Sequence, residues 1–239
     1  MSGRRSKRSV RGNGKQPAAG QVRPPRAALP DWMGDARVFL PQGYEAGYLY
    51  PLLVWLPGAG NFDLGRTMAR VSLRNFVAVQ ASPPAAGADV ADPVWEAIDR
   101  ACGRLSVHPD RIYVVGQGMG GRDAFRIACR HPTAFAGAVS LGGGFPLDEG
   151  LFARIADVRR LPMLLCAPRD ADEAAAARTD RTLRLFHAAG AQLALRIYPA
   201  AETHDATHTV SRAMLADVNR WVMDGICGAA EPRRAAHAT

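Results

Sequence analysis

No stretch of the sequence approaches the roughly 18 uninterrupted apolar residues that a membrane-spanning helix needs, so we expect no such helix. The sequence also has no C-x-x-C pair, which argues against a zinc module or a disulfide scaffold. Three of the four cysteines lie in segments with apolar periodicity, where a buried free thiol is expected. The four are Cys102, Cys129, Cys166 and Cys227. We expect a cytoplasmic protein.

Metal-ligand spacing is also missing from the sequence. His204 and His208 are four residues apart, which suits two ligands on one helix, but no acidic residue or histidine nearby supplies a third ligand. The sequence therefore predicts neither a metal site nor a cofactor.

Acidic and aromatic residues are both absent from residues 1–30, which carry eight arginines and lysines. The other 22 basic residues and all 22 acidic residues lie in 31–239, so the net charge of +8 belongs to the first segment. Such a composition cannot bury enough apolar surface to fold, and we expect a disordered tail. No apolar signal segment follows Arg4 and Arg5. The charge would attract nucleic acid, although the tail offers no aromatic ring on which bases could stack.

Strand and helix signals alternate from residue 36 onward. Short apolar runs, several of them ended by glycine or proline, predict strands. These runs are Ala36–Leu40, Leu52–Leu56, Phe76–Val79, Ile112–Val115, Ala138–Leu141, Met163–Cys166 and Leu193–Tyr198. Helices are predicted after an Asp92 N-cap, from Met119 to His131, over Thr179–Ala189 before Gly190, and over about Thr209–Met223. Strands separated by helices predict a mostly parallel sheet covered on both faces.

One turn between a predicted strand and a predicted helix is dense in glycine and reads Gly116-Gln117-Gly118-Met119-Gly120-Gly121. It matches the dinucleotide pattern G-x-G-x-x-G, but no carboxylate follows about 20 residues later to hold a ribose. Three predicted strands also precede it, whereas that pattern belongs to a first strand. The turn also has the two outer glycines of the nucleophile elbow G-x-S-x-G, a tight turn in which a serine stands above the sheet. We favour the elbow.

The residues around this turn resemble the α/β-hydrolase esterases, in particular the phospholipase/carboxylesterase, feruloyl esterase and polyhydroxybutyrate depolymerase groups. Four segments carry the resemblance, in chain order: Leu56–Gly60 as the oxyanion loop, Val107–Gly121 as the elbow, Phe135–Ala138 with Gly142–Gly144, and Arg196–Pro199 before the catalytic histidine. The resemblance covers most of residues 36–225 and implies an α/β-hydrolase fold. The expected organisation is a basic tail over 1–30, a hydrolase domain over 31–226 and a C-terminal tail over 227–239.

The resemblance places Gly118 where these esterases carry the nucleophilic serine, so the reacting atom is missing. Gln117, one position earlier, offers only an amide, which is a poor nucleophile. Pro57 stands where many relatives carry histidine. The backbone amides of Ala59 and Met119 are the implied donors of an oxyanion hole, and they survive substitution of any side chain.

The remaining catalytic positions are also implied by the resemblance, in the chain order nucleophile, acid, base. Asp170 is the expected acid and Asp172 its alternative; His204 is the expected base and His208 its alternative. Glu202 and Thr203 precede His204, where relatives usually have a small residue.

Three functions are compatible with these residues. The first is a catalytically degenerate esterase that keeps a pocket for an acyl or carbonyl ligand. The second is an active, serine-independent hydrolase in which His204, supported by Asp170, activates water. The third is a scaffold protein whose basic tail binds nucleic acid, which the salt dependence of binding with and without residues 1–30 would reveal.

Overall fold

A computed structural model describes residues 37–85, 87–145, 155–169, 173–199 and 210–229. The prediction for the tail over residues 1–30 lies outside this part of the chain. Seven strands form one sheet in the order β1-β3-β2-β4-β5-β6-β7. They are β1 (Val38–Phe39), β2 (Tyr50–Leu56), β3 (Val77–Gln80), β4 (Val107–Gln117), β5 (Gly137–Leu141), β6 (Met163–Pro168) and β7 (Leu193–Tyr198). Only β1 is antiparallel to its neighbour, which confirms the predicted sheet.

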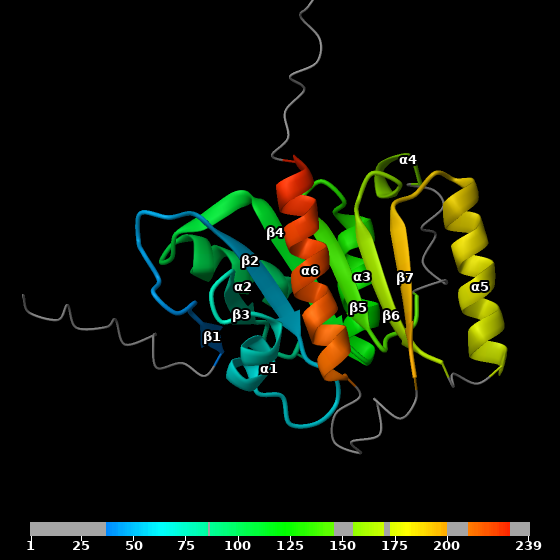
Figure 1. Cartoon of the computed structure of the whole chain (residues 1–239), viewed down its shortest axis with the longest axis horizontal. Coiled ribbons are helices and arrows are strands. Elements are labelled where there is room, and N and C mark those ends of the chain that lie inside the picture. The colour runs from blue at the N-terminus through cyan, green and yellow to red at the C-terminus, as the bar shows by residue number, and fades with distance from the viewer. Residues whose placement is uncertain (1–36, 86, 146–154, 170–172, 200–209, 230–239) are drawn as a thin grey trace, which may run out of the picture.

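Helices cover both faces of this sheet. In the described ranges they are α1 (Leu64–Val71), α2 (Asp92–Cys102), α3 (Met119–Arg130), α4 (Ile155–Val158), α5 (Glu173–Ala188) and α6 (Arg212–Ala229). Figure 1 shows α1 and α6 in front of the sheet, α2 and α3 behind it, and α5 beyond β7. None of the described helices is long and apolar enough to cross a membrane.

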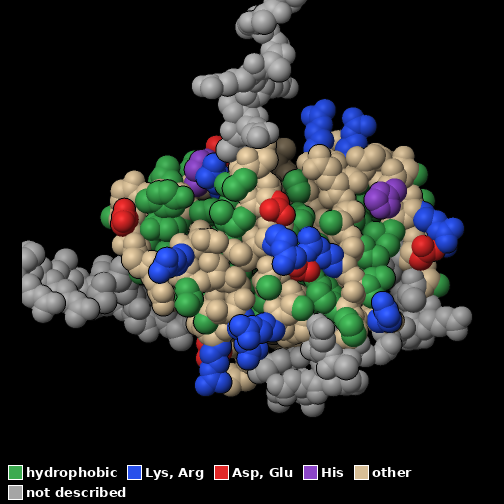
Figure 2. Space-filling view, in the orientation of Figure 1, with side chains coloured by type: hydrophobic (Ala, Val, Ile, Leu, Met, Phe, Trp, Pro, Cys, Tyr) green, Lys and Arg blue, Asp and Glu red, His purple; other side chains and the backbone are tan. Residues whose placement is uncertain are grey.

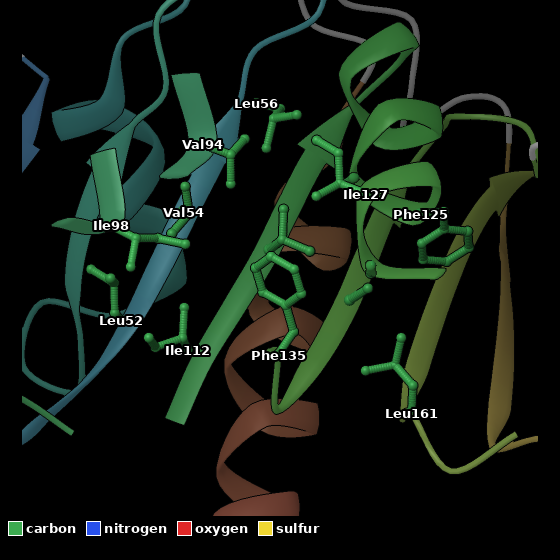
Figure 3. Packing of buried hydrophobic residues seen from close by; sticks show 14 of the residues in the cluster. Leu52, Val54, Leu56, Val94, Ile98, Ile112, Phe125, Ile127, Phe135 and Leu161 are labelled. Carbon is green, nitrogen blue, oxygen red and sulfur yellow. The ribbon is translucent and has the colours of Figure 1, made fainter. Parts of the chain in front are cut away.

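The core forms two layers because the central strands are apolar on both sides. Leu52, Val54 and Leu56 of β2 belong to the layer beneath α2 and α3, where Figure 3 shows them facing the labelled residues of those helices. Leu53 and Trp55, the alternate residues, belong to the layer beneath α1 and α6. All five are at most 6% exposed. Burial of each such side chain stabilises the fold by about 1.5–3 kcal/mol, which makes β2 a central support of the sheet.

The structure corrects several details. Asp92 is the first residue of α2 rather than its N-cap; Ala91 takes the cap position, and its N–H donates to the Asp89 carboxylate at 3.0 Å. Helix α1 was not predicted. Its N-cap is Asp63, whose side chain accepts from the Arg66 N–H.

Not all the cysteines lie where the periodicity predicts. Cys129 and Cys166 are buried free thiols, as expected. Cys102 and Cys227 are exposed, so the expectation of three buried thiols is wrong by at least one. Cys102 is the last residue of α2 and lies outside the apolar stripe of that helix, which its buried residues Val94, Ala97, Ile98 and Ala101 define.

Candidate active site

The chain turns sharply from strand to helix at Gly118, between the end of β4 and the start of α3. Gly118 has φ 53° and ψ −124°, a conformation that side-chain-bearing residues rarely adopt. Its N–H donates to the Leu141 carbonyl at 2.9 Å, and its carbonyl accepts from the Gly121 N–H at 3.0 Å. The backbone is therefore held on both sides, while a Cβ added to Gly118 would meet no atom within 4 Å.

Close packing around this turn explains the other glycines. A Cβ on Gly116 would lie 2.0 Å from the Gly120 carbonyl oxygen, and one on Gly120 would lie 2.3 Å from the Leu56 carbonyl oxygen. The loop after β2 also passes directly over the turn, since a Cβ on Gly58 would lie 2.6 Å from the Gln117 carbonyl oxygen. The first turn of α3 thus rests directly on the ends of β4 and β2.

These contacts bring the two expected oxyanion donors to the same end of the sheet. Ala59 follows Gly58 in the loop over Gln117, and Met119 begins α3. Neither N–H is paired with a described residue. The Met119 N–H also lies at the start of a helix, where the helix dipole favours negative charge.

A recess of about 160 Å³ opens beside the turn. It lies between the loop after β2, the loop after β3 and the first turns of α2 and α3. Its lining is Leu56, Pro57, Gly58, Ala81, Ser82, Pro83, Pro84, Val90, Val94, Gly120 and Asp123. Most of this lining is apolar, and among these residues only Asp123 is ionisable. Pro57 adds no hydrogen-bond donor to the recess, because it has neither an N–H nor a polar side chain.

The segments expected to carry the catalytic acid and the catalytic base both begin where strands end, at the same end of the sheet. The Arg169 N–H donates to the Tyr198 carbonyl at 2.8 Å, which fixes the end of β6 against the end of β7. Asp170 and Asp172 follow Arg169, and His204 and His208 follow Tyr198, but all four lie outside the described residues. Strand β5 lies between this pair of strands and the Gly118 turn: it pairs with β6, and the carbonyl of its last residue accepts a hydrogen bond from the Gly118 N–H.

A polar network joins these strand ends to α6. The Tyr198 hydroxyl donates to Asp217 Oδ2 at 2.5 Å, and Arg196 and Arg220 contact Asp217 Oδ1 at 2.7 and 2.5 Å. Figure 2 shows basic and acidic side chains lying together over α6. Burial raises the pKa of Asp217, but the hydrogen bonds from Arg196 and Tyr198 outweigh it and hold that pKa below its usual value. The sequence reasoning missed this network.

Cys166 and Ser140 are two further buried residues near this end of the sheet that carry a thiol or a hydroxyl group. Burial raises the pKa of the Cys166 thiol to about 11, so the reactive thiolate is scarce at neutral pH. Its Sγ lies 3.7 Å from the Tyr198 hydroxyl. Ser140 is fully buried, and its hydroxyl donates to the Gly143 carbonyl at 3.2 Å.

Replacing Asp217 with asparagine should reduce the free energy of unfolding by about 1–3 kcal/mol at pH 7. Because the pKa of Asp217 is lowered in the folded state, its contribution is present above the ordinary carboxyl pKa and is lost as the pH falls below that value. Urea unfolding at pH 7 and pH 3 should therefore show a difference from wild type that shrinks in acid. Asp180→Asn is the control, since its exposed pair with Arg184 should contribute less than about 1 kcal/mol.

Comparison with known proteins supports the fold. No protein-family model matches the chain. A curated protein of Nocardia uniformis subsp. tsuyamanensis, named "Putative esterase NocK", is 41% identical over 49 residues, which are 20% of this chain and 14% of that protein. A solved thermostable esterase matches with a TM-score of 0.56 and 19% identity over 79% of this chain and 58% of its own. A ferulic acid esterase matches with a TM-score of 0.60 and 16% identity over 79% and 90%.

The described chain spans only part of the first two of these relatives, and its identity to the solved structures is low. At this level of identity, the likeness to the two solved structures shows a shared fold. The chain has the α/β-hydrolase fold.

Proposed function

We propose that this protein is a catalytically degenerate relative of the carboxylic-ester hydrolases, which binds an acyl or carbonyl ligand at the Gly118 turn without forming an acyl-enzyme. The observation that carries the proposal is Gly118 itself. Its positive φ in a sharp turn between a strand and a helix supports the proposal, because α/β-hydrolases carry their nucleophilic serine in a turn of this kind. Glycine has no side-chain atom that could attack an ester carbonyl.

The parts of the site that depend on backbone alone support ligand binding. The amides of Ala59 and Met119 have no partner among the described residues, and preorganised N–H donors of this kind stabilise a carbonyl or oxyanion. The mostly apolar recess of about 160 Å³ beside them suits a short acyl group, because a cavity of about 150 Å³ can hold benzene.

The wild-type chain should hydrolyse p-nitrophenyl butyrate far more slowly than an ordinary esterase, and a fluorophosphonate should leave it unlabelled, because no serine oxygen is available at the turn. Titration with methyl butyrate should shift the Ala59 and Met119 amide signals in ¹⁵N NMR spectra. Met223, on the distant part of α6, serves as the unshifted reference.

Turnover equal to that of an ordinary esterase would contradict this proposal. If His204→Ala then abolished that turnover while fluorophosphonate still failed to label the protein, the mechanism would be water activation by His204 with Asp170. Absence of amide shifts together with absence of turnover would remove the ligand-binding part of the proposal.

A further inference from the structure

A second recess lies away from the Gly118 turn, between β1, β3 and the C-terminal half of α2. Its volume is about 200 Å³, and it shares no lining residue with the recess beside the turn. Its lining is Arg37, Val38, Val79, Gln80, Ala97, Arg100, Ala101, Arg104 and Leu105. This lining includes three arginines and no acidic residue.

The arginines reach the recess from two elements. Arg37 immediately precedes β1, and its guanidinium donates to the Ser82 hydroxyl at 3.0 Å. Arg100 is in the last turn of α2, where it pairs with Glu96. Arg104 follows the helix by two residues and forms no ion pair with a described residue. The recess therefore has arginines on two of its sides and no carboxylate among its lining residues.

The floor of the recess is apolar and built from small side chains. Val38, Val79 and Leu105 come from β1, from β3 and from the turn after α2. Ala97 and Ala101 are one helical turn apart, so their methyl groups lie on the same face of α2 and leave room above it. Apolar walls with a few well-placed polar groups are the usual design of a small-molecule site.

We propose that this recess binds a small organic anion, with its carboxylate or phosphate group on the arginines and a short apolar body on the floor. Guanidinium groups match both oxyanions through paired N–H donors. A volume of about 200 Å³ suits a body of roughly four to six carbons, given that benzene fits a cavity of about 150 Å³. The basic segment 1–30 is a poor occupant, since its charge would be repelled.

The test is titration of the full chain with butyl phosphate, butyrate, inorganic phosphate and butan-1-ol, followed at the Gln80 and Leu105 amides by NMR. Butyl phosphate should bind more tightly than inorganic phosphate because of the apolar floor, and butan-1-ol should not saturate. Comparison of butyl phosphate with butyrate identifies which oxyanion the arginines prefer. Arg104→Gln should weaken binding of the preferred anion about tenfold or more.

Arg70→Gln is the matched control, because Arg70, like Arg104, is an exposed arginine at the C-terminal end of a helix, but it lies on the other face of the sheet. It should leave the affinity unchanged. Equal affinities for wild type and Arg104→Gln would overturn the proposal, since anions would then be binding to the basic segment 1–30 by charge alone. So would equal binding of butan-1-ol and butyl phosphate. The result is independent of ester hydrolysis at the Gly118 turn.

Discussion

Gly118→Ser should increase the rate of p-nitrophenyl butyrate hydrolysis by at least about 10²-fold over the wild-type chain. Loss of a catalytic serine in hydrolases of this type costs far more than that, because nucleophile and base act as a unit. A side chain at position 118 would enter open space, as no atom lies within 4 Å of the added Cβ. The serine hydroxyl would then stand beside the Ala59 and Met119 amides.

The gain in activity should cost stability. At φ 53° and ψ −124°, glycine is relaxed, whereas a residue with a Cβ is strained by about 1–3 kcal/mol. Gly118→Ala is therefore the matched control, because it carries the same strain without the hydroxyl. Both variants should unfold at lower urea concentration than wild type, but only the serine variant should hydrolyse the ester and react with fluorophosphonate.

Adding His204→Ala to the serine variant tests the rest of the proposed triad. If His204 is the base, the double variant should lose most of the activity gained. A serine variant no faster than Gly118→Ala would show that the base or the oxyanion donors are not assembled around position 118. The proposal that the site is that of a degenerate ester hydrolase would then fail, although the assignment of the fold would be unaffected.

Much of the fold could be predicted because the strands are buried on both faces. Continuous apolar runs such as Leu52–Leu56 and Met163–Cys166 mark strands without knowledge of their partners, and the structure confirms both. Strand β4 is longer than predicted, since it starts at Val107 and passes through the polar His108 and Asp110. Its pairing with β2 shifts register between Tyr50 and Leu52, an irregularity that no local pattern predicts.

Helix α1 was missed although its signals are present. Asp63 is an N-cap residue, and Leu64, Met68 and Val71 form a buried stripe at helical spacing. At eight residues the helix spans only about two turns, so three buried positions are all that mark it, and the loop before it contains two glycines and one asparagine.

The candidate site was predictable only where a motif is contiguous. The Gly118 turn, with Ala59 in its companion loop, could be located from glycine spacing and resemblance. The recess beside it takes residues from four separate segments, and Asp217 meets Arg196 and Tyr198 across about 20 residues of chain. Such groupings depend on tertiary packing, which spacing along the sequence does not encode.

Gly116→Ala should reduce the free energy of unfolding by about 3 kcal/mol or more, because the added methyl group would clash with backbone atoms of α3. Its Cβ would lie 2.0 Å from the Gly120 carbonyl oxygen and 2.6 Å from the Gly121 nitrogen. Both atoms are backbone, so relief requires the first turn of α3 to move away from β4 rather than one side chain to rotate. Overpacking in a well-packed interior typically costs about 1–3 kcal/mol, and backbone displacement adds to this.

Gly144→Ala is the matched control for this substitution. Its added Cβ would meet no atom within 4 Å, and its φ is not positive. The free energy of unfolding measured in urea should therefore change by less than about 1 kcal/mol. In the Gly118→Ser background, Gly116→Ala should also abolish the activity gained, since displacement of α3 moves the Met119 amide. Equal unfolding midpoints for the two alanine variants would show that the backbone of the turn can adjust to the added methyl group without loss of stability. The precise placement of position 118, on which the proposed function depends, would then lose its structural basis.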